Sequence, residues 1–321
     1  MSIICCELRF KKELMNKIHP NRFYLEDYRR KRHRYSRDSF LGRLRRVHTW
    51  SPLIHFVLRA TGFAHRGLAN ALALKLTEVT LESDGLPDSF DNCRILLIAD
   101  LHIEGLDSLT DKVIELIKNL QYDYCFLGGD YSLYNRYDSA KTKQQMQKII
   151  KHIKTNKIYG ILGNHDYYET AVFLQSLGVT MLINENVPIE RNRTTVYLAG
   201  VDDCYLFDCA DIGRAVSDIP AGSFKILFSH SPQLYRQAQK YGFNLFIAGH
   251  THGGQICLPG GIPLIKSAKI PRKLIKGPWR YKNMTGFTTS GAGAGGNVIA
   301  RFNCPPEIAV LTLRAKKSGL T

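Results

Sequence analysis

Five short apolar runs in this chain each end directly in residues that can bind a metal ion. Four of the runs lead into Asp100-Leu101-His102, Gly129-Asp130, Gly163-Asn164-His165-Asp166 and Gly249-His250-Thr251-His252, and the fifth leads into Ser229-His230. Runs of this length are typical of buried strands, and α/β sheets carry their functional residues at the carboxyl ends of strands. The pattern therefore predicts an α/β fold whose polar side chains gather at one edge.

The ligand types at these strand ends favour a pair of divalent ions. Mixed carboxylate and imidazole donors suit Mn²⁺, Zn²⁺ or Fe²⁺, and two ions about 3.5–4 Å apart can clamp the attacking and leaving oxygens of a phosphoryl displacement. Two close dications repel each other and need a shared anionic ligand. Asp130, which stands alone after its strand, fits that bridging place.

In these blocks the chain resembles the calcineurin-like metallophosphoesterase superfamily, whose pattern is D-x-H, G-D, G-N-H-D/E, H and G-H-x-H. The match covers about residues 94 to 315, with every block in family order. The resemblance implies an α/β sandwich of two mixed β-sheets flanked by helices, with two metal ions, Mn²⁺ being the expected metal, at one end. It implies metal-assisted hydrolysis.

The same resemblance implies a role for each matching residue. Asp100, His102 and His252 are expected to hold the first metal, Asn164, His230 and His250 the second, and Asp130 both. His165 is expected to contact the scissile phosphate, polarised by Asp166. Many members follow the G-D block with Asp or Arg, whereas Tyr131 follows Asp130 here, so this loop gives no guide to substrate contacts.

Two segments narrow the resemblance to a branch of the superfamily. Residues 249–255 with the Ile-Cys-Leu-Pro that follows, and residues 301–307, are similar to the membrane-associated YkuE-like branch. That branch includes the chlamydial-type pyrophosphatase of lipid A biosynthesis, which implies cleavage of UDP-2,3-diacylglucosamine to UMP and 2,3-diacylglucosamine 1-phosphate. The alternatives are another phosphodiesterase or phosphatase substrate, including nucleic acid, and a non-catalytic scaffold, which the intact ligand set disfavours.

The net charge of +16 is concentrated at the amino terminus. Residues 1–47 contain fourteen Lys and Arg against five acids. No long apolar run accompanies them, so we expect no cleavable signal peptide. The eight cysteines show no paired zinc-ribbon spacing, which favours free thiols in a reducing compartment. We divide the chain into a basic arm (1–49), an amphipathic membrane-surface segment with a lead-in strand (50–90), the catalytic domain (91–315) and a tail (316–321).

Residues 50–76 have apolar positions at helical spacing, from Leu53 and Phe56 to Leu72 and Leu76. Arg59, Arg66 and Lys75 interrupt them, and a charged residue costs about 2.5–3.5 kcal/mol at the bilayer centre. A helix lying on an anionic membrane surface is therefore favoured over a spanning helix. The alternative is a helix packed on the catalytic domain. We expect a cytoplasmic protein peripheral on the inner face of the cytoplasmic membrane, and leave its oligomeric state open.

A second basic and apolar stretch leaves directly from His252. It begins with Leu258-Pro259-Gly260-Gly261-Ile262 and contains Lys266, Lys269 and Arg272, which we take as candidate substrate-binding residues at the rim of the site. Elsewhere, the periodicity predicts helices at 106–121, 139–154, 171–177 and 234–241, and strands at 179–183, 195–201, 286–290 and 308–314. The glycines at 291–296 predict a tight or flexible loop that is not a P-loop.

Overall fold

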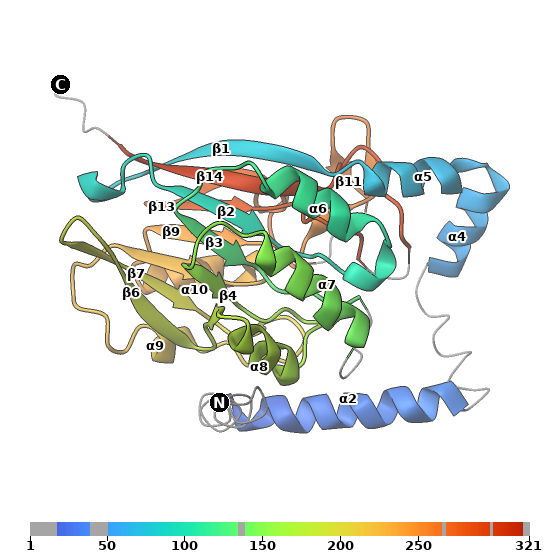
Figure 1. The fold of residues 1–321 in the computed structure, drawn as a ribbon, viewed down its shortest axis with the longest axis horizontal. Helices are drawn as coiled ribbons and strands as arrows, with labels where there is room; N and C mark the ends of the chain where they lie inside the picture. The colour runs from blue at the N-terminus through green and yellow to red at the C-terminus, as the bar shows by residue number, and fades with distance from the viewer. Residues whose placement is uncertain (1–17, 39–50, 134–138, 265–267, 296–297, 317–321) are drawn as a thin grey trace.

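The computed structural model describes residues 18–38, 51–133, 139–264, 268–295 and 298–316, with the side chains of 32–38 and 51–55 left aside. Two six-stranded sheets lie face to face, with helices on their outer faces (Figure 1). The predicted fold class, two mixed sheets flanked by helices, is confirmed.

The first sheet has the order β1-β14-β2-β3-β4-β5. Its strands β2, β3, β4 and β5 run parallel, while β14 pairs antiparallel with β2 and parallel with β1. Three helices cover its outer face. The strands are β1 (Lys75–Ser83), β2 (Arg94–Ile98), β3 (Tyr124–Leu127), β4 (Ile158–Gly160), β5 (Thr180–Met181) and β14 (Glu307–Ala315), and the helices are α6 (Leu109–Ile117), α7 (Ala140–Lys151) and α8 (Tyr168–Ser176).

The second sheet has the order β12-β13-β9-β8-β7-β6. Strands β7, β8, β9 and β13 are parallel, and both edge strands are antiparallel to their neighbours. The strands are β6 (Glu185–Arg191), β7 (Thr194–Gly200), β8 (Lys225–Phe228), β9 (Leu245–Ala248), β12 (Gly277–Tyr281) and β13 (Met284–Thr288). Two short helices cover this sheet, α9 (Ile212–Ala215) and α10 (Tyr235–Lys240), and a small hairpin of β10 (Cys257–Leu258) and β11 (Ile262–Pro263) follows β9.

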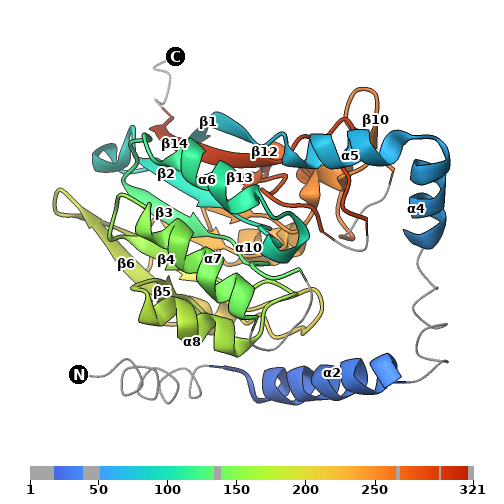
Figure 2. The same ribbon diagram turned by 45° about the vertical axis from the view of Figure 1, so that its right-hand side comes forward.

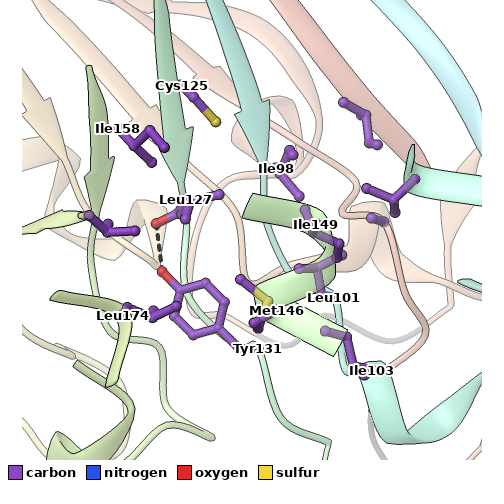
Figure 3. Packing of buried hydrophobic residues seen from close by; sticks show 14 of the residues in the cluster. Ile98, Leu101, Ile103, Cys125, Leu127, Tyr131, Met146, Ile149, Ile158 and Leu174 are labelled. Atoms are coloured by element: carbon purple, nitrogen blue, oxygen red, sulfur yellow. Dashed lines mark hydrogen bonds between the residues drawn. The ribbon is translucent and has the colours of Figure 1, made fainter. Parts of the chain in front are cut away.

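The apolar runs are continuous because both faces of each sheet are buried. Along β2, Ile95 and Leu97 pack between the two sheets, while Leu96 and Ile98 point to the opposite face, under α6 and α7. Figure 3 shows this outer cluster, in which the Tyr131 hydroxyl lies 3.0 Å from the carbonyl oxygen of Leu127. The carbonyl oxygen of Ile161 lies 2.9 Å from the same hydroxyl, whose single proton can be donated to either oxygen. The cluster fixes the direction in which the chain leaves β3.

Residues 51–72 form two short helices, not one long helix. Helices α4 (Ser51–Ala60) and α5 (Phe63–Leu72) are separated at Gly62, which has φ 74°. The prediction that helical structure extends to Leu76 is wrong. Helix α5 ends at Leu72, β1 begins at Lys75, and Leu76 pairs with Ile308 of β14. Among the described residues, no helix has both the length and the apolar character needed to cross a membrane.

The described part of the basic arm forms α2 (Pro20–Asp38), which lies along the sandwich beneath α8 (Figures 1 and 2). Arg22 is fully buried, and its guanidinium bonds to the carboxylates of Glu26 and Asp202 and, at 2.7 Å, to the carbonyl oxygen of Asp166. The Phe23 ring meets the Tyr168 ring edge-on, with centroids 5.0 Å apart. This stretch of the arm is therefore part of the folded domain.

Candidate metal centre

Parallel strands bring the predicted ligands to one edge of the sandwich. β2, β3 and β4 end just before Asp100, Asp130 and Asn164, and β8 and β9 end just before His230 and His250. All seven predicted ligands are buried. Five of them have positive φ values, Asp100, His102, Asp130, His250 and His252, at 55°, 43°, 54°, 69° and 49°. Such backbone strain in residues other than glycine is concentrated at functional sites.

The first ligand group comprises Asp100, His102 and His252, with one ligand atom from each within 4.8 Å of the others. The Nε2 atoms of the two histidines face each other at 3.1 Å. The Nδ1 atom of His102 lies 2.9 Å from the carbonyl oxygen of Ser132. Because that carbonyl can only accept, the proton of the neutral ring lies on Nδ1 and the lone pair of Nε2 faces the site.

The second ligand group comprises Asp130, His230 and His250, again with ligand atoms within 4.8 Å of one another. The side-chain oxygen of Asn164 lies 3.2 Å from Nε2 of His230. Oδ2 of Asp130 lies 3.3 Å from Nε2 of His230 and 3.6 Å from Nε2 of His102. Asp130 thus faces a histidine of each group, as a bridging ligand requires.

Burial and mutual charge set the protonation of these groups. Burial lowers the pKa of His102 to about 4 and raises that of Asp100 to about 7. Burial also opposes charge on His230, but the carboxylates of Asp130 and Asp100 outweigh it and raise the His230 pKa to about 10. Two buried carboxylates held beside buried imidazoles form a donor set that fits two divalent cations, which would take the place of the protons.

Asp166 occupies a different place from the one expected. Its carboxylate accepts hydrogen bonds from three backbone nitrogens, those of Asp130 at 2.7 Å, Gly163 at 2.8 Å and Tyr131 at 3.0 Å. It therefore joins the loop after β3 to the loop after β4. His165 is half-buried at the same loop, and its Nδ1 is buried without a hydrogen-bond partner among the described residues, so Asp166 does not polarise that nitrogen here.

Arg301 holds the loop at residues 290–293 and contacts the ligand His252. It is not among the predicted site residues. This fully buried side chain donates from Nε to the carbonyl oxygen of Gly293 at 2.9 Å and from Nη2 to that of Ser290 at 2.7 Å, and its Nη2 lies 3.2 Å from Nδ1 of His252. The loop it holds packs tightly on the ligands. A Cβ added to Gly295 would lie 2.5 Å from Nε2 of His252, so only glycine fits there.

The candidate substrate-binding residues have no described contact with the ligands. Lys266 lies outside the described residues, and Lys269 and Arg272 are exposed. Another cation of the same stretch, Lys276, lies beside the residue that follows His252. A Cβ added to Gly253, the residue after His252, would lie 3.2 Å from Cδ of Lys276. Its position depends on how the chain returns from the hairpin, which spacing along the sequence does not reveal.

An exposed aromatic side chain borders the second ligand group. The Tyr205 ring lies against the His250 ring, with centroids 4.4 Å apart. The turn that carries it is held by Asp203, whose carboxylate accepts from the backbone nitrogens of Tyr205 at 3.0 Å, Leu206 at 2.6 Å and Phe207 at 2.7 Å. This turn forms one wall of the site.

The chain is similar in sequence to a known family and to several of its members. Residues 93–254 match the family described as "Calcineurin-like phosphoesterase". The uncharacterized metallophosphoesterase YkuE of Bacillus subtilis is 29% identical over 266 residues, which span 79% of this chain and 90% of YkuE. YkoQ of the same organism, also an uncharacterized metallophosphoesterase, is 27% identical over 77% of this chain and 93% of its own length. The phosphodiesterase YaeI of Escherichia coli is 25% identical over 68% of this chain and 82% of YaeI.

Proposed function

Because this chain belongs to the calcineurin-like phosphoesterase family and is a metal-dependent hydrolase, we propose that it hydrolyses the pyrophosphate of a lipid-linked nucleotide, with UDP-2,3-diacylglucosamine as the substrate. The products are then UMP and 2,3-diacylglucosamine 1-phosphate. The observation that carries the hydrolase activity is the pair of buried ligand groups that meet at Asp130.

In this proposal each polar residue of the site has one task. Two divalent ions, Mn²⁺ in our proposal, lower the pKa of water and neutralise charge on phosphoryl oxygens when bound. The seven ligands hold them, and Asn164 also orients the phosphate. His165, whose ring centroid lies 5.1 Å from that of His102, donates a proton to the leaving oxygen or stabilises its charge. Asp166 holds the loop of Asp130 and the loop of His165 together through its hydrogen bonds to their backbone nitrogens.

The lipid part of the proposal is supported by an apolar surface beside the site, here called the docking face. It comprises exposed side chains of α4, of α5 and of residues 258–264. Helices α4 and α5 and the β10–β11 hairpin lie at the same end of the molecule in Figures 1 and 2. Exposed apolar side chains that gather in this way mark interaction sites. The members are Phe56, Val57, Phe63, Leu68, Leu258, Ile262 and Leu264, with 69% of Phe56 and 58% of Leu264 exposed.

Residues 300–303 join the two halves of the docking face. The Phe302 ring meets the Phe63 ring edge-on, at 6.3 Å between centroids. The backbone carbonyl oxygen of Phe302 accepts a hydrogen bond from the backbone nitrogen of Cys257 at 2.9 Å. The hairpin itself starts a few residues after His252, and Pro263 packs against Gly254. The docking face is therefore continuous with the loop that carries a metal ligand.

The charge around the docking face suits an anionic membrane. The sequence has no Asp or Glu from residue 39 to residue 77 or from residue 219 to residue 306. Both halves of the docking face, and the segment between them, fall in these stretches. Apolar side chains among Lys and Arg bind interfaces by burial and by attraction to anionic headgroups. We therefore propose peripheral binding at the cytoplasmic membrane, on its inner face, with the metal centre beside the lipid surface.

A second candidate substrate is a simpler phosphodiester, because YaeI, which shares 25% identity, is named a phosphodiesterase. A hydrolysis panel with added Mn²⁺ separates the two. It compares UDP-2,3-diacylglucosamine, a simple phosphodiester, a cyclic nucleotide and p-nitrophenyl phosphate. We expect the lipid nucleotide to have the highest kcat/KM, with release of UMP. A preference for the simple or cyclic diester would overturn the lipid substrate, and no hydrolysis with Mn²⁺, Zn²⁺ or Fe²⁺ would overturn the proposed function as a whole.

A further inference from the structure

Arg29 on α2 stands between two loops that border the second ligand group. Its Nη1 atom donates to the carbonyl oxygen of Asn164 at 3.4 Å. Its guanidinium carbon lies 4.9 Å from the centroid of the Phe207 ring. Phe207 belongs to the turn whose Tyr205 packs on His250. The basic arm thus brings a positive charge to the rim of the site formed by Asn164, His230 and His250.

The place of Arg29 is fixed by the docking of α2. Arg22 precedes it by seven residues, about two helical turns, so both side chains lie on the same face of the helix. Arg22 is fully buried, binds Asp202 and the carbonyl oxygen of Asp166, and stacks at 3.7 Å on the same Phe207 ring. The two arginines therefore contact the same loop, Arg22 at the carbonyl oxygen of Asp166 and Arg29 at that of Asn164. Because Arg22 is anchored in the protein, Arg29 is held at the rim.

We propose that Arg29 binds the phosphate next to the reacting one and so favours pyrophosphate substrates over single phosphate esters. This inference rests on the proposed function. In a pyrophosphate the second phosphorus shares an oxygen with the first, so its remaining oxygens lie a short distance from the metals, where a side chain at the rim can reach them. A guanidinium matches phosphate oxygens with two parallel hydrogen bonds, and Arg29 is only half-buried, which leaves it accessible.

A purely structural role for Arg29 has a different consequence. If the side chain only holds the carbonyl oxygen of Asn164, its loss displaces a metal ligand and slows hydrolysis of every substrate alike. If it binds the second phosphate, only substrates and inhibitors that carry two phosphates are affected. The comparison of one-phosphate and two-phosphate compounds therefore distinguishes the two roles.

The test uses the full chain with Mn²⁺ and the variants Arg29→Gln and Arg29→Lys. Lys31→Gln is the matched control, since it removes the same charge from the same helix at a residue whose ion pair, with Asp27 at 2.7 Å, is exposed. The kcat/KM is measured for UDP-2,3-diacylglucosamine in detergent and for bis(p-nitrophenyl) phosphate. The inhibition of bis(p-nitrophenyl) phosphate hydrolysis by UDP and by UMP is measured in parallel.

For Arg29→Gln we expect kcat/KM for the two-phosphate substrate to fall about ten- to a hundredfold, the range of a charge-assisted hydrogen bond. Inhibition by UDP weakens similarly, while that by UMP and the hydrolysis of bis(p-nitrophenyl) phosphate stay near wild type. Arg29→Lys restores part of the effect, and Lys31→Gln shows none. An equal loss on all compounds, or no loss on any, overturns the inference while the proposed function stands. A wild-type protein that cleaves neither substrate overturns the proposed function itself.

Discussion

The carboxylate of Asp166 accepts a hydrogen bond from the backbone nitrogen of Asp130, at 2.7 Å. The residue proposed to bridge both metals is thereby tied to the loop that carries Asn164 and His165. In return, the backbone nitrogen of His165 donates to Oδ1 of Asp130 at 2.8 Å. These reciprocal bonds couple the bridging carboxylate to the loop of the proposed acid, so the geometry of one depends on the other.

Asp166→Asn should loosen this connection. An amide presents an NH₂ group toward one of the backbone donors, which leaves a buried N–H without an acceptor, at a cost of about 1–3 kcal/mol. We expect a lower free energy of unfolding in urea and weaker metal retention. Asp107→Asn, at an exposed ion pair with Lys141, is the control and should change stability little. Wild-type stability and metal content in Asp166→Asn would show that the connection is dispensable.

His165→Ala should retain its metals and lose turnover. The side chain lies beside the ligands without belonging to either ligand group, and a general acid typically contributes about 10²–10⁴-fold. Metal content and kcat are measured on the same preparation, with the exposed His152→Ala as control. A loss of metal as large as that in His250→Ala would make His165 a ligand instead.

Replacing two side chains of the docking face should reduce membrane binding. Each buried apolar side chain contributes about 1.5–3 kcal/mol, so Phe56→Ser combined with Leu264→Ser should weaken binding to anionic vesicles by about a hundredfold or more. Hydrolysis of a water-soluble phosphodiester should not change. Tyr24→Ser is the control, because this side chain on α2 is 71% exposed and lies outside the docking face. Unchanged sedimentation of the double variant with vesicles would refute the membrane proposal.

Glu26 should make the stability of the protein depend on pH. Burial raises its carboxyl pKa to about 7, although Arg22 opposes the shift. A raised pKa in the folded state means that folding takes up a proton between the unfolded value, about 4.5, and 7. The stabilisation is therefore present below pH 4.5 and is lost as the pH rises to 7. Urea unfolding of Glu26→Gln should lack this part of the pH dependence, and a variant with the wild-type slope would contradict the assignment.

The apolar runs predicted the strands at the site well. The apolar runs that lead into Gly129-Asp130 and Gly249-His250 are strands β3 and β9, because strands buried on both faces leave an uninterrupted apolar signal. Edge strands leave a weaker one. β6 is largely half-exposed and contains Pro188, and β12 has only one buried residue, Trp279. Neither stood out in the sequence, since an edge strand needs no continuous apolar run.

The sequence pattern does not predict which residues of the basic arm contact the loops of the site. Arg22 stands in a run rich in Lys and Arg, which normally indicates a solvated surface. Its partners, Asp202 and the carbonyl oxygen of Asp166, lie 180 and 144 residues away. Nothing local distinguishes Arg22 from Arg30. Only the packing of α2 on the turn at Phe207 shows which arginine is buried, and likewise which one reaches Asn164.

The most direct test of the account is the metal content and activity of Asp130→Asn. Because Asp130 faces both ligand groups, loss of its negative charge leaves two close dications poorly compensated. We expect purified wild-type protein to bind two divalent ions per chain by mass spectrometry, and Asp130→Asn to bind fewer and to lose nearly all hydrolysis while its circular dichroism spectrum is unchanged. Two bound ions and full activity in Asp130→Asn would contradict the dinuclear centre proposed here.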